Sequence, residues 1–369
     1  MSLHERWRLT RVINARGTYT PLGVSRSSPF VARAVAEVLG EFVVVDELQA
    51  AVSDLVASMT GAEAAAVTHC VAAGITLAVA AAMAGAADDA VSALPDSGGM
   101  PNRVVIPAPH AVDYGHPILT DVRLAGATPL LAGHATACTL DDLRCALAAE
   151  GTACLLLVSS RLVQGEPLDL ADAFALAHEH GVPAIIDGAA QDLRLDALLA
   201  TGADLVLVSA HKYLASPTAG LIVGRAALVQ ACRAHERGIG RAMKATKEGI
   251  AGVLAALEER RELDLDAWRQ EQERKVRWFV EAAGALPGIA ASALPDPVGM
   301  PFSRVVLRVD AAAGWLSAAS LARALQDSRP QIRVMEHAIG QGCLVLELVP
   351  LSDGEMRTII ERLVEIGTS

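Results

Sequence analysis

The most restrictive feature of this sequence is a lysine that directly follows a short apolar segment. Residues 204–208 are Asp-Leu-Val-Leu-Val, a Ser-Ala-His tripeptide leads from them to Lys212, and a second apolar run follows at 219–223. Apolar runs of this length predict buried strands. A lysine at the end of a buried strand is unfavourable unless its charge is neutralised or its amine is used covalently. Two interpretations remain open here: Lys212 forms a Schiff base with an aldehyde cofactor, or its side chain extends to solvent.

A second apolar segment ends in an acid at Asp187. Residues 183–187 are Pro-Ala-Ile-Ile-Asp, and the 25 positions from Asp187 to Lys212 leave room for one short helix and one strand. Ligands of a parallel sheet bind outside the carboxyl ends of its strands, so we expect both side chains at one edge. A carboxylate there suits the pyridine nitrogen of pyridoxal 5'-phosphate (PLP). A helix N-cap is the alternative role for Asp187, and the pairing with Lys212 makes it the weaker one.

Strand and helix patterns alternate along most of the chain. The segment 46–59 repeats apolar residues with a helical period. Short apolar runs predict strands at 64–68, 103–106, 128–131, 154–158, 183–187, 204–208 and 219–223. Further helices are expected at 71–86, 139–150, 169–180 and 194–201. This alternation predicts an α/β fold whose mostly parallel sheet is covered by helices on both faces.

The pattern changes at about residue 240, where long charged helices begin. Beyond them the sequence predicts strands at 303–309, 331–336 and 343–348 and a final helix at 352–366. These elements indicate a smaller α+β domain, and 369 residues suffice for one large and one small domain. We therefore expect an N-terminal segment at 1–30, a large domain at 31–240 and a small C-terminal domain at 241–369.

Several segments together resemble one enzyme family. Besides the regions of Asp187 and Lys212, they are Val12–Thr18, Asp46–Gln49, Thr60–Ala65, Val67–Thr68, Ala72–Gly74, Gly240–Lys244 and Lys247–Glu248. The chain resembles the fold type I PLP-dependent enzymes (the aspartate aminotransferase superfamily), in particular the branch that contains selenocysteine synthase and D-glucosaminate-6-phosphate ammonia-lyase. The resemblance covers nearly the whole chain. It implies PLP as cofactor and a homodimer or higher symmetric oligomer.

The resemblance also implies roles for residues in the large domain. Lys212 is expected to bind PLP covalently, and Asp187 to contact the pyridine nitrogen. The cofactor phosphate requires backbone N–H groups at a helix N-terminus, and the turn at His69, Cys70 and Val71 is the candidate. Related enzymes usually carry Ser-Gly-Ala at these three positions. The bulkier side chains here are a departure from that pattern, and His69 either contacts the phosphate or faces solvent.

Other polar residues at strand ends are candidates for cofactor binding. The resemblance places His110 over the cofactor ring, where an imidazole can hold the ring and move protons, the alternative being a polar surface residue. Ser209 is at a position where this family often binds the phosphate by a hydroxyl, and His211 lies next to the lysine. Gln164 and Gln191 each follow a strand, either as ligands of the cofactor or substrate or as turn and cap residues.

Four residues are candidates for substrate binding. Arg333 follows from the resemblance, because an arginine of the small domain often grips the substrate carboxylate; a surface arginine is the alternative. Arg16 and Arg241 are further cationic candidates, and Tyr114 lies in the loop after His110. The N-terminal segment carries Arg16 and is broken by glycine and proline, so we expect it at the subunit interface, near the partner's cofactor, or as a strap on its own subunit.

Composition limits the classes of partner and the compartment. The net charge of −11 argues against nucleic acid as a partner. The six cysteines include no C-x-x-C pair, which favours free thiols in a reducing compartment over disulfides or a metal site. The N-terminus lacks a signal-peptide pattern, and the apolar stretch near 71–87 is expected to be a buried helix rather than a membrane span. We expect a cytoplasmic enzyme without metal.

The reaction is less restricted than the cofactor. Lys212, once released from the cofactor, is the natural acid and base for the α-proton of an amino substrate. The resemblance favours α,β-elimination by an ammonia-lyase or dehydratase acting on a small amino acid or amino sugar acid. An aminotransferase, a racemase or epimerase, and a β-replacement transferase remain alternatives. A catalytically inactive interaction protein is the alternative from another class, and the intact Asp187 and Lys212 argue against it.

Overall fold

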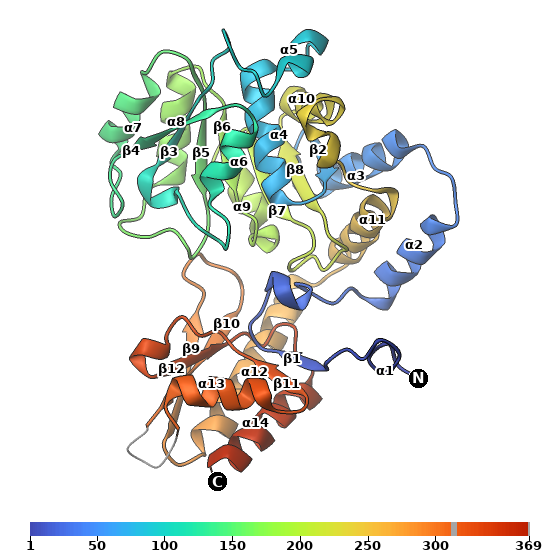
Figure 1. Ribbon diagram of the computed structural model, residues 1–369, viewed down its shortest axis with the longest axis vertical. Coiled ribbons are helices and arrows are strands. Elements are labelled where there is room, and N and C mark those ends of the chain that lie inside the picture. The colour runs from blue at the N-terminus through green and yellow to red at the C-terminus, as the bar shows by residue number, and fades with distance from the viewer. Residues whose placement is uncertain (311–315, 368–369) are drawn as a thin grey trace. The chain divides into compact units, whose positions relative to one another are not determined.

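A computed structural model describes residues 1–310 and 316–367, which form two compact units (Figure 1). The larger unit is the continuous stretch Ser27–Glu262, and the smaller unit combines the first 26 residues with the chain from Leu263 onwards. These units differ from the predicted boundaries. The N-terminal segment is part of the smaller unit because one of its strands pairs there, and residues 241–262 belong to the larger unit because their helix packs on two helices near its start.

A seven-stranded sheet forms the centre of the larger unit, in the order β2-β8-β7-β6-β5-β3-β4. The strands are β2 (Ala64–Thr68), β3 (Arg103–Pro107), β4 (Thr128–Ala132), β5 (Thr152–Val158), β6 (Ala184–Asp187), β7 (Leu205–Ser209) and β8 (Gly220–Gly224). Within it, β8 is antiparallel to both of its neighbours, while the strands from β7 to β4 are parallel. The predicted α/β fold with a mostly parallel sheet is confirmed.

Helices cover both faces of this sheet. They are α2 (Pro29–Leu39), α3 (Val45–Thr60), α4 (Val71–Ala84), α5 (Asp88–Ala93), α6 (Ile118–Leu124), α7 (Leu140–Leu147), α8 (Leu170–Glu179), α9 (Leu195–Leu199), α10 (Ala226–Ala234) and α11 (Lys247–Arg261). Successive strand side chains point to opposite faces. Leu155 and Leu157 therefore pack in the core with α3, α8 and α11, whereas Leu156 and Val158 pack in the core with α4, α6 and α10. No helix of the described chain is long and apolar enough to span a membrane.

The smaller unit contains two sheets. In one, β1 (Val12–Asn14) runs parallel to β11 (Gln331–Arg333). In the other, β10 (Ser303–Val309) lies between β12 (Cys343–Leu346) and β9 (Ile289–Pro295), antiparallel to both. The helices are α1 (Leu3–Trp7), α12 (Leu265–Gly284), α13 (Ala318–Asp327) and α14 (Asp353–Gly367). The strands expected at 331–336 and 343–348 are shorter than predicted, and β9, an exposed edge strand, is an addition.

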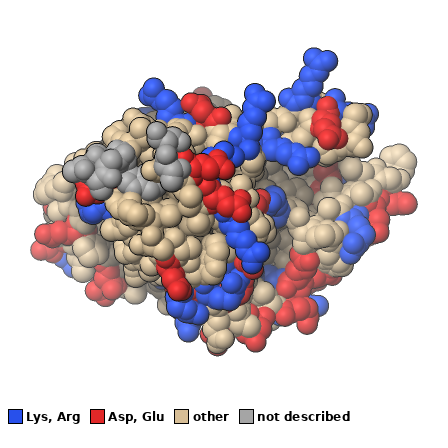
Figure 2. Space-filling view, turned by 90° about the horizontal axis from the view of Figure 1, so that it is seen from below, with Lys and Arg blue, Asp and Glu red and all other residues tan. Residues whose placement is uncertain are grey.

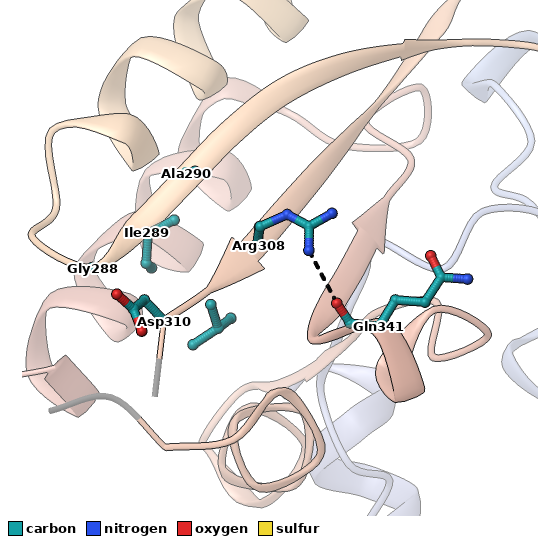
Figure 3. A pocket seen from close by; sticks show the side chains of 7 residues that line it. Gly288, Ile289, Ala290, Arg308, Asp310 and Gln341 are labelled. Carbon is teal, nitrogen blue, oxygen red and sulfur yellow. Dashed lines mark hydrogen bonds between the residues drawn. The ribbon is translucent and has the colours of Figure 1, made fainter. Parts of the chain in front are cut away.

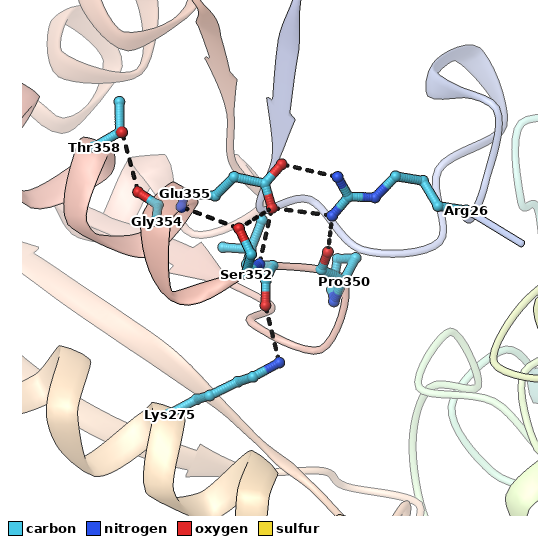
Figure 4. A network of polar contacts seen from close by, with 8 residues as sticks. Arg26, Lys275, Pro350, Ser352, Gly354, Glu355 and Thr358 are labelled. Atoms are coloured by element: carbon cyan, nitrogen blue, oxygen red, sulfur yellow. Dashed lines mark hydrogen bonds and ion pairs between the residues drawn. The ribbon is translucent and has the colours of Figure 1, made fainter. Parts of the chain in front are cut away.

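Polar contacts fix the N-terminal segment within the smaller unit. The guanidinium of Arg26 donates to both carboxylate oxygens of Glu355, at 3.0 Å each, and to the carbonyl of Pro350 (Figure 4). Closer to the N-terminus, Gly17 has a φ of +77°, and a Cβ atom there would lie 2.6 Å from the carboxylate of Glu347. That buried carboxylate is 2.9 Å from a guanidinium nitrogen of Arg304. The segment is therefore held by specific contacts rather than attached as a loose tail.

The surface carries both signs of charge. On the face drawn in Figure 2, Lys and Arg side chains are interspersed with Asp and Glu side chains, and no broad area of one sign stands out. Mixed charge of this kind does not resemble the basic surface that proteins present to nucleic acid.

Candidate active site

The carboxyl ends of the parallel strands bring most of the predicted cofactor residues to one edge of the sheet. Gly220, at the start of β8, pairs with Thr68 at the end of β2 and with Ser209 at the end of β7. Asp187, at the end of β6, pairs with Val158 at the end of β5. Asp187 also pairs with Leu207, two residues before the end of β7. The carboxyl ends of β2, β7, β6 and β5 therefore lie at one edge of the sheet, which is where ligands of an open α/β sheet bind.

Lys212 lies in a tight loop between β7 and β8. Its backbone N–H donates to the carbonyl of Ser209 at 3.3 Å, and its carbonyl accepts from the N–H of Ala215 at 3.2 Å. Ala215 has a φ of +57°, a left-handed backbone conformation that residues other than glycine adopt rarely. The side chain of Lys212 is half-buried. A short, internally bonded loop thus fixes the backbone of the lysine at the sheet edge.

Asp187 is a buried carboxyl, 5% exposed, whose Oδ1 accepts from the N–H of Ala189 at 2.9 Å. Burial raises its pKa to about 6, while the charge of Lys212 and the Ala189 hydrogen bond act in the opposite direction. Removing a carboxylate from water is costly unless a cationic or hydrogen-bonding partner is present. A protonated pyridine nitrogen is such a partner, so Asp187 fits the predicted role.

His110 is buried next to Asp187's strand. It ends the 3-10 turn Ala108–His110, and its Nδ1 accepts from the N–H of Val158 at 2.9 Å. Burial lowers its pKa to about 4. The ring is therefore neutral at physiological pH, with its proton on Nε2. A neutral ring held by one nitrogen suits stacking against a flat cofactor better than it suits proton transfer.

The phosphate cup predicted at residues 69–71 forms the N-terminus of α4. Cys70 is the N-cap residue, and it makes no side-chain hydrogen bond to the first turn. The first N–H groups of a helix lack backbone partners and attract anions. Gly220 contacts this turn so closely that a Cβ atom would lie 2.6 Å from the carbonyl carbon of Cys70 and 2.9 Å from the nitrogen of Val71. The backbone of this turn is thus packed directly against Gly220, and its free N–H groups are the candidate for an anion site.

The segment 240–244 joins the cup from the side. The carbonyl of Met243 accepts from the N–H of His69 at 2.8 Å and from the hydroxyl of Thr68 at 2.9 Å, and Thr68 forms an isolated bridge with Lys244. The side chain of His69 is exposed. These contacts bring the backbone that carries Arg241 and Lys244 to the same edge of the sheet, as the substrate-binding role of Arg241 requires.

Ser209 and His211 lie on either side of the lysine loop's start. Ser209 is buried, and its Oγ is 3.5 Å from Nδ1 of His211. That nitrogen also lies 2.9 Å from the carbonyl oxygen of Ala219. Burial lowers the pKa of His211, and the positive charges of Lys212 and His69 add to the effect. The ring of His211 is therefore used in contacts within the lysine loop. Ser209 ends β7, the strand that precedes this loop.

The two predicted glutamines differ in their environment. Gln191 is buried, and its Oε1 accepts from Arg194 at 3.0 Å. Gln164 is exposed, and its amide donates to the nearby carbonyl of Leu162 at 3.3 Å. Gln191 thus belongs to the structured turn after Asp187, whereas Gln164 makes the local turn contact that was the alternative to cofactor binding.

Arg16 and Arg333 lie together in the smaller unit. Arg333 ends β11, opposite Asn14 at the end of β1, and Arg16 follows two residues later. The guanidinium of Arg16 stacks 4.0 Å from the ring centre of Tyr19 and is 3.5 Å from Glu336. The structure thus places Arg333 at the end of the small sheet and Arg16 two residues beyond the strand that pairs with it.

Two clusters near the site were not predicted from the sequence, although Tyr114 of the first was already a substrate-binding candidate. In the first, the hydroxyl of Tyr114 donates to Oδ2 of Asp121, and Nε2 of His116 is 2.7 Å from Oδ1 of the same carboxylate. Its only sequence signal was the position of Tyr114 and His116 in the loop after His110. Asp121 gave none, because an acid in the first turn of a helix is common.

The second cluster supports the lysine loop. Nη2 of Arg260 is 3.1 Å from Oδ2 of Asp192 and donates to the carbonyl of Tyr213 at 2.9 Å. The Asp192 side chain is 4% exposed, and its Oδ1 has no hydrogen-bond partner among the described residues. Burial raises the pKa of Asp192, while Arg260 lowers it most among the opposing charges. One arginine on α11 therefore joins the turn after Asp187 to the residue after Lys212.

A pocket of the smaller unit contains none of the predicted site residues. It lies between the ends of β9 and β10, and the guanidinium of Arg308 within it donates to the carbonyl of Gln341 at 3.2 Å (Figure 3). It is lined by Gly288, Ile289, Ala290, Arg308, Val309, Asp310 and Gln341. Among the described residues, no group of three or more His, Cys, Asp or Glu side chains is arranged to hold a metal ion.

The sequence matches known proteins over its whole length. Residues 122–274 match the model of a family described as L-seryl-tRNA selenium transferase. The chain is 35% identical over 367 residues to D-glucosaminate-6-phosphate ammonia lyase of Salmonella typhimurium, covering 99% of this chain and 98% of that protein. It is 34% identical over 360 residues to the 5'-C-glycyluridine monooxygenase-decarboxylase of a Streptomyces species, covering 96% and 89% respectively.

Solved structures give the same result. A structure of D-glucosaminate-6-phosphate ammonia-lyase matches with a TM-score of 0.89 at 35% identity, covering 100% of this chain and 98% of that one. Serine palmitoyltransferase of Sphingomonas wittichii matches with a TM-score of 0.59 at 16% identity, covering 96% and 87%, which is a likeness of fold alone.

Proposed function

The chain belongs to the fold type I family of PLP-dependent enzymes that includes D-glucosaminate-6-phosphate ammonia-lyase, and we propose that it releases ammonia from a 2-amino acid with a 3-hydroxyl group by α,β-elimination. The predicted resemblance to this branch is confirmed by 35% identity over nearly the whole chain. One observation carries the proposal: Asp187 ends β6, Lys212 follows the neighbouring parallel strand β7, and the charge of Lys212 acts on the Asp187 carboxyl.

The residues at the sheet edge fit PLP. We assign Lys212 to the covalent bond, Asp187 to the pyridine nitrogen and His110 to the face of the ring. The N–H groups at the start of α4, together with Ser209, are assigned to the phosphate. When bound, PLP provides an electron sink for the bonds at the substrate's α-carbon. The raised pKa of buried Asp187 supports this arrangement, because a cationic partner offsets the cost of its burial.

Lys212 is the proton carrier for the α-carbon. When it is not bonded to the cofactor, the amine of Lys212 would take the α-proton and hold it as an ammonium group. The loop contacts to Ser209 and Ala215 keep its backbone in place while the side chain exchanges partners. The charge of Lys212 lowers the pKa of both buried carboxyls, Asp187 and Asp192, which places all three groups in one electrostatic environment.

Substrate recognition rests on cationic residues. A phosphorylated sugar acid carries two anionic groups, and Arg and Lys side chains bind such groups by charge-assisted hydrogen bonds. We assign Arg241 and Lys244 of the larger unit, together with Arg16 and Arg333 of the smaller unit, to this role. Tyr114 is assigned to the uncharged part of the substrate.

We further propose a homodimer or a higher symmetric oligomer in the cytoplasm, without a nucleic-acid partner. All six cysteines are free, in keeping with a reducing compartment. The N-terminal segment, with Arg16, is the part that we expect at the subunit interface. The net charge of −11 and the mixed charges of Figure 2 support a small-molecule substrate over tRNA.

The test is a direct assay with D-glucosaminate-6-phosphate. The purified, PLP-loaded protein should release one ammonia for each keto acid formed, and Lys212→Ala should release none. Because another relative is named a monooxygenase-decarboxylase, dioxygen uptake and carbon dioxide release are measured in the same samples. Dioxygen-dependent carbon dioxide release without ammonia would contradict an eliminating lyase, and inactivity toward a panel of 3-hydroxy amino acids would do so as well.

A further inference from the structure

The cluster of Tyr114, His116 and Asp121 has the arrangement of a site rather than of a structural contact. The carboxylate of Asp121 is 3% exposed, yet it binds two side chains that are about two-fifths exposed: the residue exposure of Tyr114 is 43% and the side-chain exposure of His116 is 40%. The two oxygens of the buried carboxylate each bind one accessible polar side chain. The carboxylate therefore fixes the orientation of both side chains, and with it the atoms that a ligand would meet.

Hydrogen bonds support the backbone around the cluster. The hydroxyl of Thr76, on α4, donates to the carbonyl of Asp121 at 2.9 Å, so the helix that forms the phosphate cup also supports this acid. In the loop, the N–H of Tyr114 donates to the carbonyl of His116 at 3.3 Å, and Asp113 bridges to Pro117. Both rings are therefore held by the loop as well as by the carboxylate.

The cluster lies beside the cofactor residues. Its loop follows His110 directly. Burial raises the pKa of Tyr114, and its hydrogen bond to Asp121 and the charges of Asp121, Asp187 and Cys70 add to the effect. The charge of Asp121 in turn reaches Asp187. Tyr114 thus stays protonated and donates its proton to Asp121, so the phenol is no proton donor for a substrate.

Elimination requires two proton transfers, and Lys212 accounts for only one of them. Hydroxide is a poor leaving group because water is a very weak acid, so the departing oxygen must receive a proton. Neither His110 nor His211 suits this task, since burial lowers the pKa of both. His116 has one ring nitrogen on Asp121, a second ring nitrogen, and access to solvent from which it can regain a proton.

We propose that His116, positioned by Asp121, donates the proton to the departing 3-hydroxyl group, and that Tyr114 binds the hydroxyl-bearing carbon chain of the substrate through its phenol oxygen. The C3–O bond breaks, its electron pair leaves with the oxygen, and the proton of His116 completes a water molecule. The pair freed from the Cα–H bond forms the Cα–Cβ double bond, and Lys212 holds the α-proton. His116 is then reprotonated from solvent. This assignment rests on the proposed elimination, and Asp121 acts as a positioning residue.

The experiment separates the two proton transfers. D-Glucosaminate-6-phosphate is incubated with the PLP-loaded enzyme in D₂O, and NMR follows α-proton exchange while an enzymatic assay follows ammonia. For His116→Gln we expect ammonia release to fall by about 10²- to 10⁴-fold, with exchange within about tenfold of the wild type. Asp121→Asn should show the same split. Tyr114→Phe should raise KM more than it lowers kcat.

A change of leaving group gives a second measurement. With the 3-chloro-3-deoxy analogue, chloride departs without a proton, so His116→Gln should approach the wild-type rate. The affinity for PLP, measured from its visible absorbance, should be unchanged, which shows that the variant is folded and loaded. His178→Gln is the matched control, because His178 is 45% exposed and lies 2.8 Å from Asp204, outside the proposed machinery. It should alter neither transfer.

The possible results distinguish a failure of the role of His116 from a failure of the proposed elimination. Equal losses of exchange and of ammonia release in His116→Gln, or an equal loss with the chloro analogue, would overturn the role of His116 while leaving the lyase proposal intact. If the wild-type enzyme neither exchanges the α-proton nor releases ammonia, the proposed elimination fails, and the role of His116 fails with it.

Discussion

Gly220 and Cys70 are in such close contact that no side chain fits between them: a Cβ on Gly220 would lie 2.6 Å from the carbonyl carbon of Cys70. Cys70 is the N-cap residue of α4, whose first N–H groups are the phosphate cup that we propose. A contact between two backbones therefore sets the position of this turn.

Gly220→Ala should displace the cup and weaken PLP binding by at least tenfold, because the obstacle is backbone and cannot rotate away. Titration with PLP, followed by visible absorbance, measures the effect. Gly284→Ala is the control, since nothing lies within 4 Å of its Cβ position, and it should bind PLP normally. An unchanged affinity in Gly220→Ala would show that the cofactor phosphate binds elsewhere.

Lys212 should carry the cofactor covalently. Borohydride reduction of the yellow holoenzyme, followed by peptide mapping, should place the pyridoxyl group on Lys212. Lys247 is engaged elsewhere, because its ammonium donates to the carbonyls of Leu39 at 3.2 Å and Glu41 at 2.6 Å. Recovery of the label on Lys244 or Lys247 would move the active site away from the end of β7.

The cofactor-free protein should lose stability as the pH rises through about 6, because Asp187 must then ionise while buried. A carboxyl whose pKa is raised by folding stabilises the folded state fully only below its unfolded pKa, near 3.8. The shift corresponds to about 3 kcal/mol. Urea unfolding of cofactor-free wild type and Asp187→Asn from pH 4 to pH 8 should show the variant gaining relative stability with pH. A difference independent of pH would contradict the raised pKa of the buried Asp187 carboxyl.

Arg260→Met should destabilise the larger unit by about 3 kcal/mol, because it leaves the buried carboxyl of Asp192 without its cation. Asp192→Asn should recover part of that loss in the double variant, since no charge then remains to be paired. Thermal or urea unfolding of the four proteins gives the coupling energy. Strictly additive losses would mean that the pair does not act as a unit.

The proposed sharing of the site between subunits is tested by hybrid dimers. Inactive Arg16→Ala and Lys212→Ala proteins, mixed under conditions that exchange subunits, should regain part of the activity if Arg16 serves the partner's cofactor. Sedimentation at micromolar concentration establishes the oligomer first, and an active monomer would refute the dimer. If hybrids form but remain inactive, Arg16 does not serve the partner's cofactor. It then acts in its own subunit, or it only makes its contacts with Tyr19 and Glu336.

Much of the fold was predictable because its signals are local. The apolar runs that form the sheet are continuous, since parallel strands are buried on both faces, and the helix predicted at 46–59 matches α3 closely. The edge strand β9 escaped prediction because most of its residues are exposed, which removes the apolar pattern. The domain boundary was wrong because β1 pairs with β11, a contact between distant positions that no local pattern records.

The residues of the candidate site likewise include some that the sequence reveals and some that it does not. Residues at strand ends, such as Asp187 and Lys212, are recognisable because the sequence marks where a buried strand stops. The roles of Asp121 and Asp192 depend on partners in other elements, and in the sequence both look like ordinary acids at the start of a helical turn. The pairing of Asp192 with Arg260 spans 68 positions. Such contacts emerge only when the sheet has fixed where each loop lies.

The two-part composition of the smaller unit has a consequence for biosynthesis. Residues 1–26 leave the ribosome before the larger unit does, yet Ile13 pairs with Ile332, which is made after it. The larger unit lies wholly between these two strands, so it can fold while translation continues. Ile13, which is buried in the folded protein, reaches its β-pairing partner only after the whole larger unit has been made. This strand is thus synthesised before the larger unit but takes its native place after it.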